Sequence, residues 1–279
     1  MNARSFAIVA NGFADGPAQA LRDYLVDKRV DVITVSHPLT PEQGTRHLIE
    51  HYAHGGRTKV REVDLHLRAP SSYAIDPFVP VIPPRVDVWF GFNPLACARG
   101  LAARRLRHAR FVVLWSVDFV PDRFGAGTLL TRVYDRIDRA CCMRADARVE
   151  LTNEARTARN DRHRLPPDAA PAHVVPMGAW LDRVPTTAAD NVAARRVVFL
   201  GHLVPRQGVG TLLDAVRQLA DRGESVTAEV IGSGPLEAEL RAEARNLGLG
   251  DAVRFHGFLE DHREVERLLA RGSVAVART

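Results

Sequence analysis

Two glycine-bearing turns in the second half of the chain have the residues of a phosphate-binding site. Residues 201–208 read Gly-His-Leu-Val-Pro-Arg-Gln-Gly, and residues 231–235 read Ile-Gly-Ser-Gly-Pro. Each turn follows an apolar run and precedes an amphipathic run, which is typical of a strand that leads into a helix. Such junctions present free backbone N–H groups and the positive end of a helix dipole, which attract phosphate. Side by side in a parallel sheet, they predict a site for a diphosphate.

Polar residues also follow two apolar runs in the first half of the chain, where α/β folds bind ligands. The candidates are Asn11, Gly12, Asp15, Gly16 and Ser116. We add Asp118, whose carboxylate could orient or deprotonate an acceptor hydroxyl. The alternatives remain open: the glycines could serve a turn that needs a positive φ angle, and Asp118 could cap a helix.

The elements that must position these residues alternate between strand and helix. In the first half we predict strands at 5–10, 30–35, 60–65, 86–90, 111–115, 148–151 and 173–175. We predict helices at 17–28, 41–53, 94–107, 129–143 and 153–164, with a proline-rich loop at 70–84. This alternation indicates an α/β doubly wound domain with a mostly parallel sheet.

The alternation stops at residues 179–194, which we interpret as a connection between two domains. The first domain would then span residues 1–178 and the second 195–279. In the second domain we predict helices beginning near 209, 235 and 260 and a last strand at 274–277. Parallel strands are normally covered on both faces, so a sheet that ends there is expected to expose apolar surface.

The second domain resembles the donor-binding half of the group 1 (family 4) glycosyltransferases, which are retaining enzymes of the GT-B fold. The order and spacing of several elements carry this resemblance. They are Gly201, the turn at 205–208, the run at 211–215, the turn at 231–236 and the Phe-His-Gly-Phe at 255–258. The segment at 174–178 is similar to the one that leads into the second domain of that family.

The resemblance implies two Rossmann-like domains, the second incomplete, with a nucleotide-sugar donor between them and no tightly bound metal or cofactor. The implied donor-binding residues are Gly12, Gly201, His202, Arg206, Gln207, Gly208, Gly232, Ser233, Gly234, Pro235, Gly257 and Phe258. Asn11, Asp15, Gly16 and Ser116 would lie on the acceptor side, with Asp118 as the catalytic candidate.

Three departures from the family pattern bear on activity. His202 and Gln207 stand where the family has Arg and Lys on the diphosphate, leaving Arg206 as the nearby cation. Val117 stands where the family has its catalytic histidine. The family's paired glutamates, eight positions apart, would lie beyond Thr279, so we expect a C-terminally truncated transferase.

We therefore expect a hexosyltransferase that uses a nucleotide sugar, with a glycan, a lipid-linked carrier or a small molecule as acceptor. A non-catalytic remnant that binds nucleotide sugars is the main alternative. A nucleotide-sugar epimerase of the same fold would need acidic and histidine residues that we cannot assign.

Composition limits the other possibilities. The chain has 279 residues, 46% of them hydrophobic, and a formal net charge of +5. The charge comes with no nucleic-acid-binding signature, so we expect no nucleic acid partner. Three cysteines, two of them adjacent, make a poor disulfide framework, and we expect buried thiols. No apolar run has the length of a signal peptide or membrane span, which favours a cytoplasmic protein.

Two further patterns have ordinary explanations that we prefer. His47, Glu50 and His51 match a zinc-protease pattern on the predicted helix at 41–53, but no third ligand can be named, so we expect no metal. The arginine-rich stretch at 96–110 could rest on an anionic membrane surface, which leaves a peripheral membrane contact open. A solvated helix face is the more common outcome for such a pattern.

Overall fold

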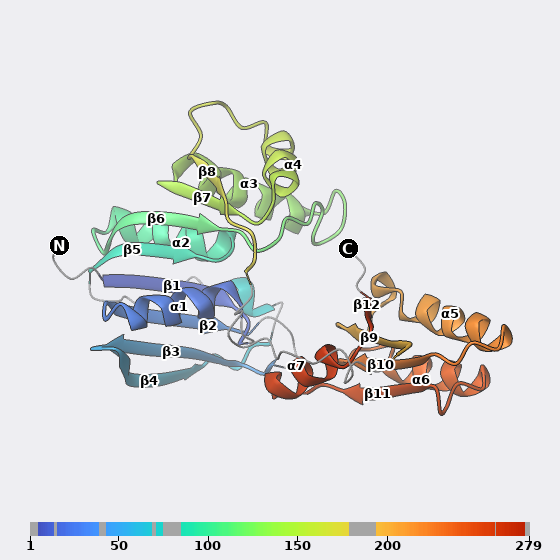
Figure 1. The fold of residues 1–279 in the computed structure, drawn as a ribbon. Helices are drawn as coiled ribbons and strands as arrows, with labels where there is room; N and C mark the ends of the chain where they lie inside the picture. Colours follow the sequence, from blue (N-terminus) through green and yellow to red (C-terminus); the bar gives the residue numbers. More distant parts are fainter. Residues whose placement is uncertain are drawn as a thin grey trace. The chain divides into compact units, whose positions relative to one another are not determined.

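The computed structural model describes residues 5–13, 16–38, 43–68, 71–74, 85–178, 194–259 and 261–276. The chain divides into two compact units, Met1–Gly178 and Ala179–Thr279. Almost all of the predicted connection at 179–194, and most of the predicted loop at 70–84, lie outside the described residues. Each unit is described by itself (Figure 1).

The first unit is built on an eight-stranded sheet with the order β4-β3-β2-β1-β5-β6-β7-β8. Its strands are β1 (Ser5–Asn11), β2 (Asp31–His37), β3 (Arg46–Ala53), β4 (Gly56–Asp64), β5 (Val86–Gly91), β6 (Ala109–Trp115), β7 (Ala147–Glu150) and β8 (Ala172–Val174). Its helices are α1 (Pro17–Asp27), α2 (Pro94–Arg105), α3 (Leu129–Arg144) and α4 (Asn153–His163), with a short 3₁₀ turn at Ser71–Ala74. All neighbouring strands are parallel except β2–β3 and β3–β4, so the predicted doubly wound, mostly parallel sheet is confirmed.

Apolar side chains fill both faces of this sheet. Leu25 of α1 belongs to a core on one face, whereas α2 and α3 bury Trp89 and the three cysteines on the other. Cys97, Cys141 and Cys142 are all fully buried and free, as predicted. A hydrogen bond with Cys97 and burial raise the pKa of Cys141, and burial raises the pKa of Cys142 to about 12.

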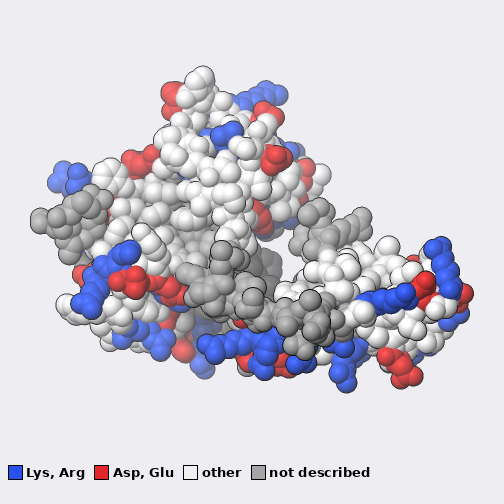
Figure 2. Space-filling view, in the orientation of Figure 1, with Lys and Arg blue, Asp and Glu red and all other residues white. Residues whose placement is uncertain are grey.

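The predicted helix at 41–53 is wrong. Residues Arg46–Ala53 form strand β3, which pairs antiparallel with β2 and with β4 through a turn at His54-Gly55. The histidine spacing that suggests one helix face also places His47 and His51 on one face of a strand. Tertiary pairing at the sheet edge decides the conformation here. The outer strand β4 is almost entirely exposed, and Figure 2 shows charged side chains of both signs over this edge.

His47 contacts a second buried histidine. The Nδ1 atoms of His37, at the end of β2, and His47 lie 2.8 Å apart, so one ring donates a hydrogen bond to the other. Burial, the neighbouring ring and Arg99 lower the pKa of His37 to about 3. Burial likewise lowers the pKa of His47. Among the described residues no group of three or more metal-binding side chains occurs.

The second unit has a four-stranded parallel sheet with the order β11-β10-β9-β12. Its strands are β9 (Arg196–Leu200), β10 (Thr227–Ile231), β11 (Val253–Gly257) and β12 (Val274–Val276). Its helices are α5 (Val209–Asp221), α6 (Glu237–Asn246) and α7 (His262–Ala270), with a 3₁₀ turn at Pro205–Gln207. Helices α5 and α6 cover one face and α7 the other, but every residue of β12 is exposed.

One side of the arginine-rich stretch at 96–110 belongs to the core. Helix α2 packs against β5, β6 and α3, and Arg99 is buried with its guanidinium over the Trp89 ring. Arg104 forms an ion pair with Asp146 at 2.6 Å. The exposed residues of this stretch are Ala102, Arg105, Leu106, Arg107 and Arg110. No described helix is both long enough and apolar enough to cross a membrane.

The buried histidine pair predicts acid sensitivity of the first unit. His37 has a folded pKa of about 3 against an ordinary value of 6.5, so the folded state prefers the neutral ring. The neutral His37 ring stabilises the folded state fully above the unfolded pKa of 6.5, and this stabilisation is lost as the pH falls towards 3. The free energy of unfolding should therefore decrease by up to about 1.4 kcal/mol per pH unit in this window. Urea unfolding at several pH values measures this decrease in the free energy of unfolding.

His37→Gln should flatten this pH dependence, because the amide does not titrate. His173→Gln is the matched control, since His173 is exposed in β8. An equally steep pH dependence in His37→Gln and in the unsubstituted protein would contradict the assignment.

Candidate functional site

The two glycine-bearing turns of the second unit lie against each other at the C-terminal edge of the sheet. Gly201 follows β9 and donates from its backbone N–H to the carbonyl of Ile231 at 3.0 Å. Two residues further, the Leu203 N–H donates to the Ser233 carbonyl, also at 3.0 Å. The turns at 201–208 and 231–235 therefore form one continuous backbone surface, which we call the glycine corner.

The glycine corner has no room for side chains at two positions. A Cβ atom on Gly232 would lie 1.9 Å from the Gly201 carbonyl oxygen, and one on Gly234 would lie 2.5 Å from the Leu203 carbonyl oxygen. Gly232 also has a φ of 128°, which side-chain-bearing residues rarely adopt. Close approach of two backbones is thus the reason for these glycines, whatever the ligand.

Of the two helix starts at this corner, that of α5 is better suited to an anion. Gly208, in the left-handed region with a φ of 66°, leads into α5, whose first turn has no acidic residue. The first turn of α6 carries Glu237 and Glu239, which already occupy the positive end of its dipole. Glu243 of α6 also lies near Gly210, so one carboxylate borders the α5 start as well.

The structure corrects the placement of Pro235. We predicted it at the first helical position, but α6 begins at Glu237 and Pro235 lies in the preceding turn. The Glu237 N–H donates to the Gly234 carbonyl at 3.0 Å and closes this turn.

The remaining predicted donor residues have different surroundings. The Nδ1 atom of the exposed His202 lies 2.7 Å from the Ser233 carbonyl, which can only accept, so Nδ1 carries the proton and Nε2 faces away. Gln207 ends the 3₁₀ turn, and its neighbour Arg206 has a side chain outside the described part of the chain. Gly257 ends β11 and accepts from the Gly232 N–H at 2.8 Å, while Phe258 is 70% exposed.

In the first unit, the predicted residues lie at the C-terminal edge of the sheet. From β1 the chain continues to β2 on one side of the sheet, whereas β5 and the later strands lie on the other side of β1. The strand order therefore reverses between β1 and β5, which is the topological switch point of the sheet. Asn93, at the N-cap of α2, donates from Nδ2 to Asn11 Oδ1 at 2.6 Å across this point. We did not predict Asn93; an asparagine between a strand and Pro94 was the available signal.

The glycines of this edge differ in conformation. Gly12 has a φ of 103° and donates to the His37 carbonyl at 2.7 Å, which ties the ends of β1 and β2 together. Gly16 is extended and precedes the first residue of α1. Asp15 lies outside the described residues.

Asp118 is an exposed carboxylate that already has a partner. Arg123 donates to its Oδ1 at 2.6 Å, and the side chain remains about half exposed. It caps no helix, because α3 begins only at Leu129. Val117 packs against the apolar core on the α1 face, and the Ser116 hydroxyl is buried and donates to the Asp118 carbonyl at 2.7 Å.

A buried arginine of α4 fixes the loop that carries Ser116 and Asp118. Arg159 is 1% exposed. Its Nη2 donates to the Ser116 hydroxyl and, at 3.3 Å, to the Asp118 carbonyl. Its guanidinium also stacks on Phe119, with 4.7 Å to the ring centroid. Sequence reasoning missed this residue, because a single arginine in a polar helix gives no sign of burial.

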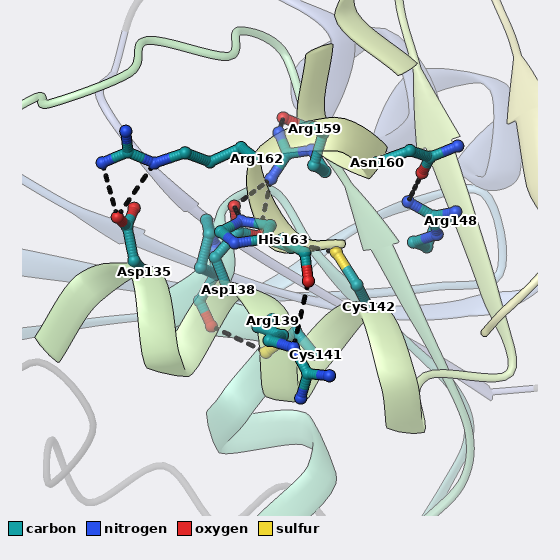
Figure 3. A network of polar contacts seen from close by, with 12 residues as sticks. Asp135, Asp138, Arg139, Cys141, Cys142, Arg148, Arg159, Asn160, Arg162 and His163 are labelled. Carbon is teal, nitrogen blue, oxygen red and sulfur yellow. Dashed lines mark hydrogen bonds and ion pairs between the residues drawn. The ribbon is translucent and has the colours of Figure 1, made fainter. Parts of the chain in front are cut away.

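Two buried carboxylates balance the Arg159 charge. Asp138 of α3 accepts from Nη1 at 2.5 Å, and Glu150 at the end of β7 lies 2.9 Å from Nε. His163 Nε2 lies 2.9 Å from Asp138 Oδ2, the same oxygen that accepts from Arg159 (Figure 3). Burial acts to lower the pKa of Arg159, but the two carboxylates outweigh it and raise the pKa. Burial raises the pKa of Glu150, although Arg159 and Arg148 oppose this.

The second unit matches a known family. Residues 189–278 match the model described as "Glycosyl transferases group 1". The chain is also 38% identical, over 61 residues, to a 2-deoxystreptamine glucosyltransferase of Streptomyces kanamyceticus. That similarity spans 22% of this chain and only 16% of the length of the relative. Residues 189–278 thus match the group 1 glycosyl transferases, as the resemblance implied.

Solved structures share the fold of the whole chain. HepE of Anabaena in complex with UDP has a TM-score of 0.62 at 16% identity, over 98% of this chain and 73% of its own. A glycosyltransferase of Rickettsia africae has a TM-score of 0.62 at 11% identity, over 99% and 73%. Starch synthase IV of Arabidopsis thaliana, bound to ADP and acarbose, has a TM-score of 0.60 at 11% identity, over 98% and 78%. The GT-B fold is confirmed.

Removal of the Arg159 charge should strongly destabilise the first unit. Arg159→Met leaves Asp138 and Glu150 buried without their cation, which should cost about 3–5 kcal/mol. Arg162→Met, three positions along the same helix, removes only more exposed contacts with Asp122 and Asp135 and should destabilise the unit far less. Urea unfolding, followed by tryptophan fluorescence, measures the free energy of unfolding of both variants. An equal loss in the two variants would contradict this prediction.

Gly234→Ala should loosen the glycine corner. The new methyl group would meet the Leu203 backbone, which has no room to yield, at a cost of about 1–3 kcal/mol. Gly250→Ala in the same unit meets no atom within 4 Å and should change stability by about 0.5 kcal/mol or less. Amide hydrogen exchange in β9 and β10 measures the effect. Unchanged exchange in Gly234→Ala would mean that the two turns do not need this contact.

Proposed function

We propose that this protein transfers a hexosyl group from a nucleotide-sugar donor, with retention of the anomeric configuration as in family 4. The observation that carries the proposal is the glycine corner, where two turns at the carboxyl ends of neighbouring parallel strands present bare backbone beside the start of α5. Backbone N–H groups and a helix dipole at such a position favour a diphosphate. The family of residues 189–278 and the UDP bound to HepE support this assignment.

The negative charge that develops on the departing diphosphate is the main electrostatic demand of such a reaction. In our proposal the α5 dipole meets it, with Arg206 or His202 as an additional donor. His202 Nδ1 already donates to the Ser233 carbonyl, so its Nε2 can act as a donor only when the ring carries a second proton. Asp118 would orient the acceptor hydroxyl, and release from Arg123 would make its carboxylate available as a base.

The acceptor in this proposal is a glycan, a lipid-linked carrier or a small molecule, and the enzyme works in the cytoplasm. For a lipid-linked acceptor, the start of α3 suits a membrane surface better than α2 does. Leu129 and Leu130 are 75% and 56% exposed there, beside Arg132, and no ion pair of that arginine occurs among the described residues. Exposed leucines with arginines fit an anionic lipid surface.

A non-catalytic nucleotide-sugar-binding protein is the second candidate. One observation favours it: Val117, partly buried against the core, stands at the place of the family's catalytic histidine. A binding protein and an enzyme would hold the diphosphate at the glycine corner in the same way.

Incubation of the full chain with a panel of labelled nucleotide sugars tests both candidates. We expect saturable binding by calorimetry and release of the free nucleoside diphosphate. Asp118→Asn should lower turnover about 10²- to 10⁴-fold, the usual contribution of a general acid or base, while leaving donor affinity unchanged. Asp122→Asn is the matched control, since that carboxylate pairs with Arg162 instead. Binding without turnover favours the non-catalytic candidate, and failure to bind any donor contradicts both.

A further inference from the structure

A hollow lies in the first unit, away from the edge that carries Asn11 and Ser116. It has a volume of about 460 Å³ and lies between α4, the loop after α4 and the starts of β7 and β8. Arg148 and Ala172 belong to those strand starts, whereas Ser116 follows the end of β6. This volume is within the range of about 300–1,000 Å³ that is typical of small-molecule sites. We call it the Arg148–Arg156 pocket.

The polar side chains of this pocket offer hydrogen-bond donors without matching acceptors. The Arg148 side chain is 4% exposed and donates from Nε to the Ala170 carbonyl at 2.9 Å and from Nη1 to Asn160 Oδ1 at 3.1 Å. Its Nη2 has no partner among the described residues. Because arginine only donates, the Asn160 oxygen must face it, so the Asn160 NH₂ group is left for the pocket (Figure 3).

Arg156 adds a second cation to the same wall. It is half-buried on α4, and within the described ranges its guanidinium has neither an ion pair nor a hydrogen bond. The hydroxyl of Thr157, one position along, also lines the pocket. Four side chains therefore bring unused donors to one hollow.

The residues that line the pocket carry positive charge. None of the lining residues is acidic. The carboxylate of Glu150 lies 3.9 Å from Arg148 Nη1, but it lies closer to Arg159, at 2.9 Å. Arg148 Nη2 and the Arg156 guanidinium keep donors for a ligand, and such arginine donors match the geometry and charge of a phosphate group.

The other wall is apolar and stiff. It consists of Leu165, Pro166 and Pro167, with Ala169, Pro171 and Ala172 beyond them. Proline carries no N–H, so this wall adds no further donor and offers its ring faces to the body of a ligand. The pocket is also far larger than a single phosphate ion requires.

We propose that the Arg148–Arg156 pocket binds a phosphorylated small molecule, with the phosphate on the two arginines and the organic part on the proline wall. The site is separate from the glycine corner, which belongs to the other unit of the chain. The inference stands on the lining of this pocket alone and does not depend on the proposed transferase activity.

Calorimetry with the full chain tests the proposal, with glucose 6-phosphate and inorganic phosphate as probes. We expect the ester to bind about tenfold more tightly than inorganic phosphate, because only the ester contacts the proline wall. Arg156→Gln should weaken ester binding by about tenfold or more, since it removes a charge-assisted contact. Arg132→Gln is the matched control, because Arg132 is exposed on α3, outside the lining. It should change the affinity less than about twofold.

Thr157→Trp provides a second variant that leaves the charge unchanged. Thr157 is exposed on α4, so the fold should tolerate the substitution, while the indole would occupy the hollow and abolish binding. Equal weakening by Arg156→Gln and Arg132→Gln would overturn the proposal, as would equal affinity for the two probes. Binding that survives Arg156→Gln but is lost in Gly234→Ala would belong to the glycine corner and would also overturn it.

Discussion

The second unit depends on the contact between two backbones that no side chain separates. Gly232 and Gly234 let the turn after β10 lie directly on the turn after β9, and the hydrogen bonds of Gly201 and Leu203 hold it there. This contact sets how close the start of α5 lies to the second turn. The main chain would therefore position a ligand at the glycine corner, and side chains such as His202 would contribute less to its position.

The first unit fixes its corresponding loop in the opposite way, with a buried charge. Arg159 contacts α3, β7 and the loop after β6, so one guanidinium sets the relative positions of three elements. Buried ion pairs contribute little net stability against an apolar alternative, but they tolerate few other arrangements. We interpret Arg159 as a residue that holds the backbone of Ser116 and Asp118 in one conformation while the Asp118 carboxylate remains exposed.

The sequence predicted the strand–turn–helix units well and the sheet edge and buried charges poorly. Apolar periodicity identified β1, α1 and the three strand–helix units of the second unit, because their cores are local in sequence. The helix predicted at 41–53 became β3, although Gly55-Gly56 between two polar-apolar runs was a hairpin signal. Arg159, Glu150 and Asn93 were missed, since burial of a polar side chain depends on partners far along the chain. Asp15 and the Arg206 side chain remain predictions.

The distribution of thiols has a practical consequence. All three cysteines lie in the core of the first unit, fully buried, and the second unit has none. A thiol-reactive dye can therefore modify the chain only after α2 and α3 separate from their sheet, and opening of the second unit would pass unnoticed. The labelling rate becomes an intrinsic probe of opening in one half of the molecule, read without any engineered tag.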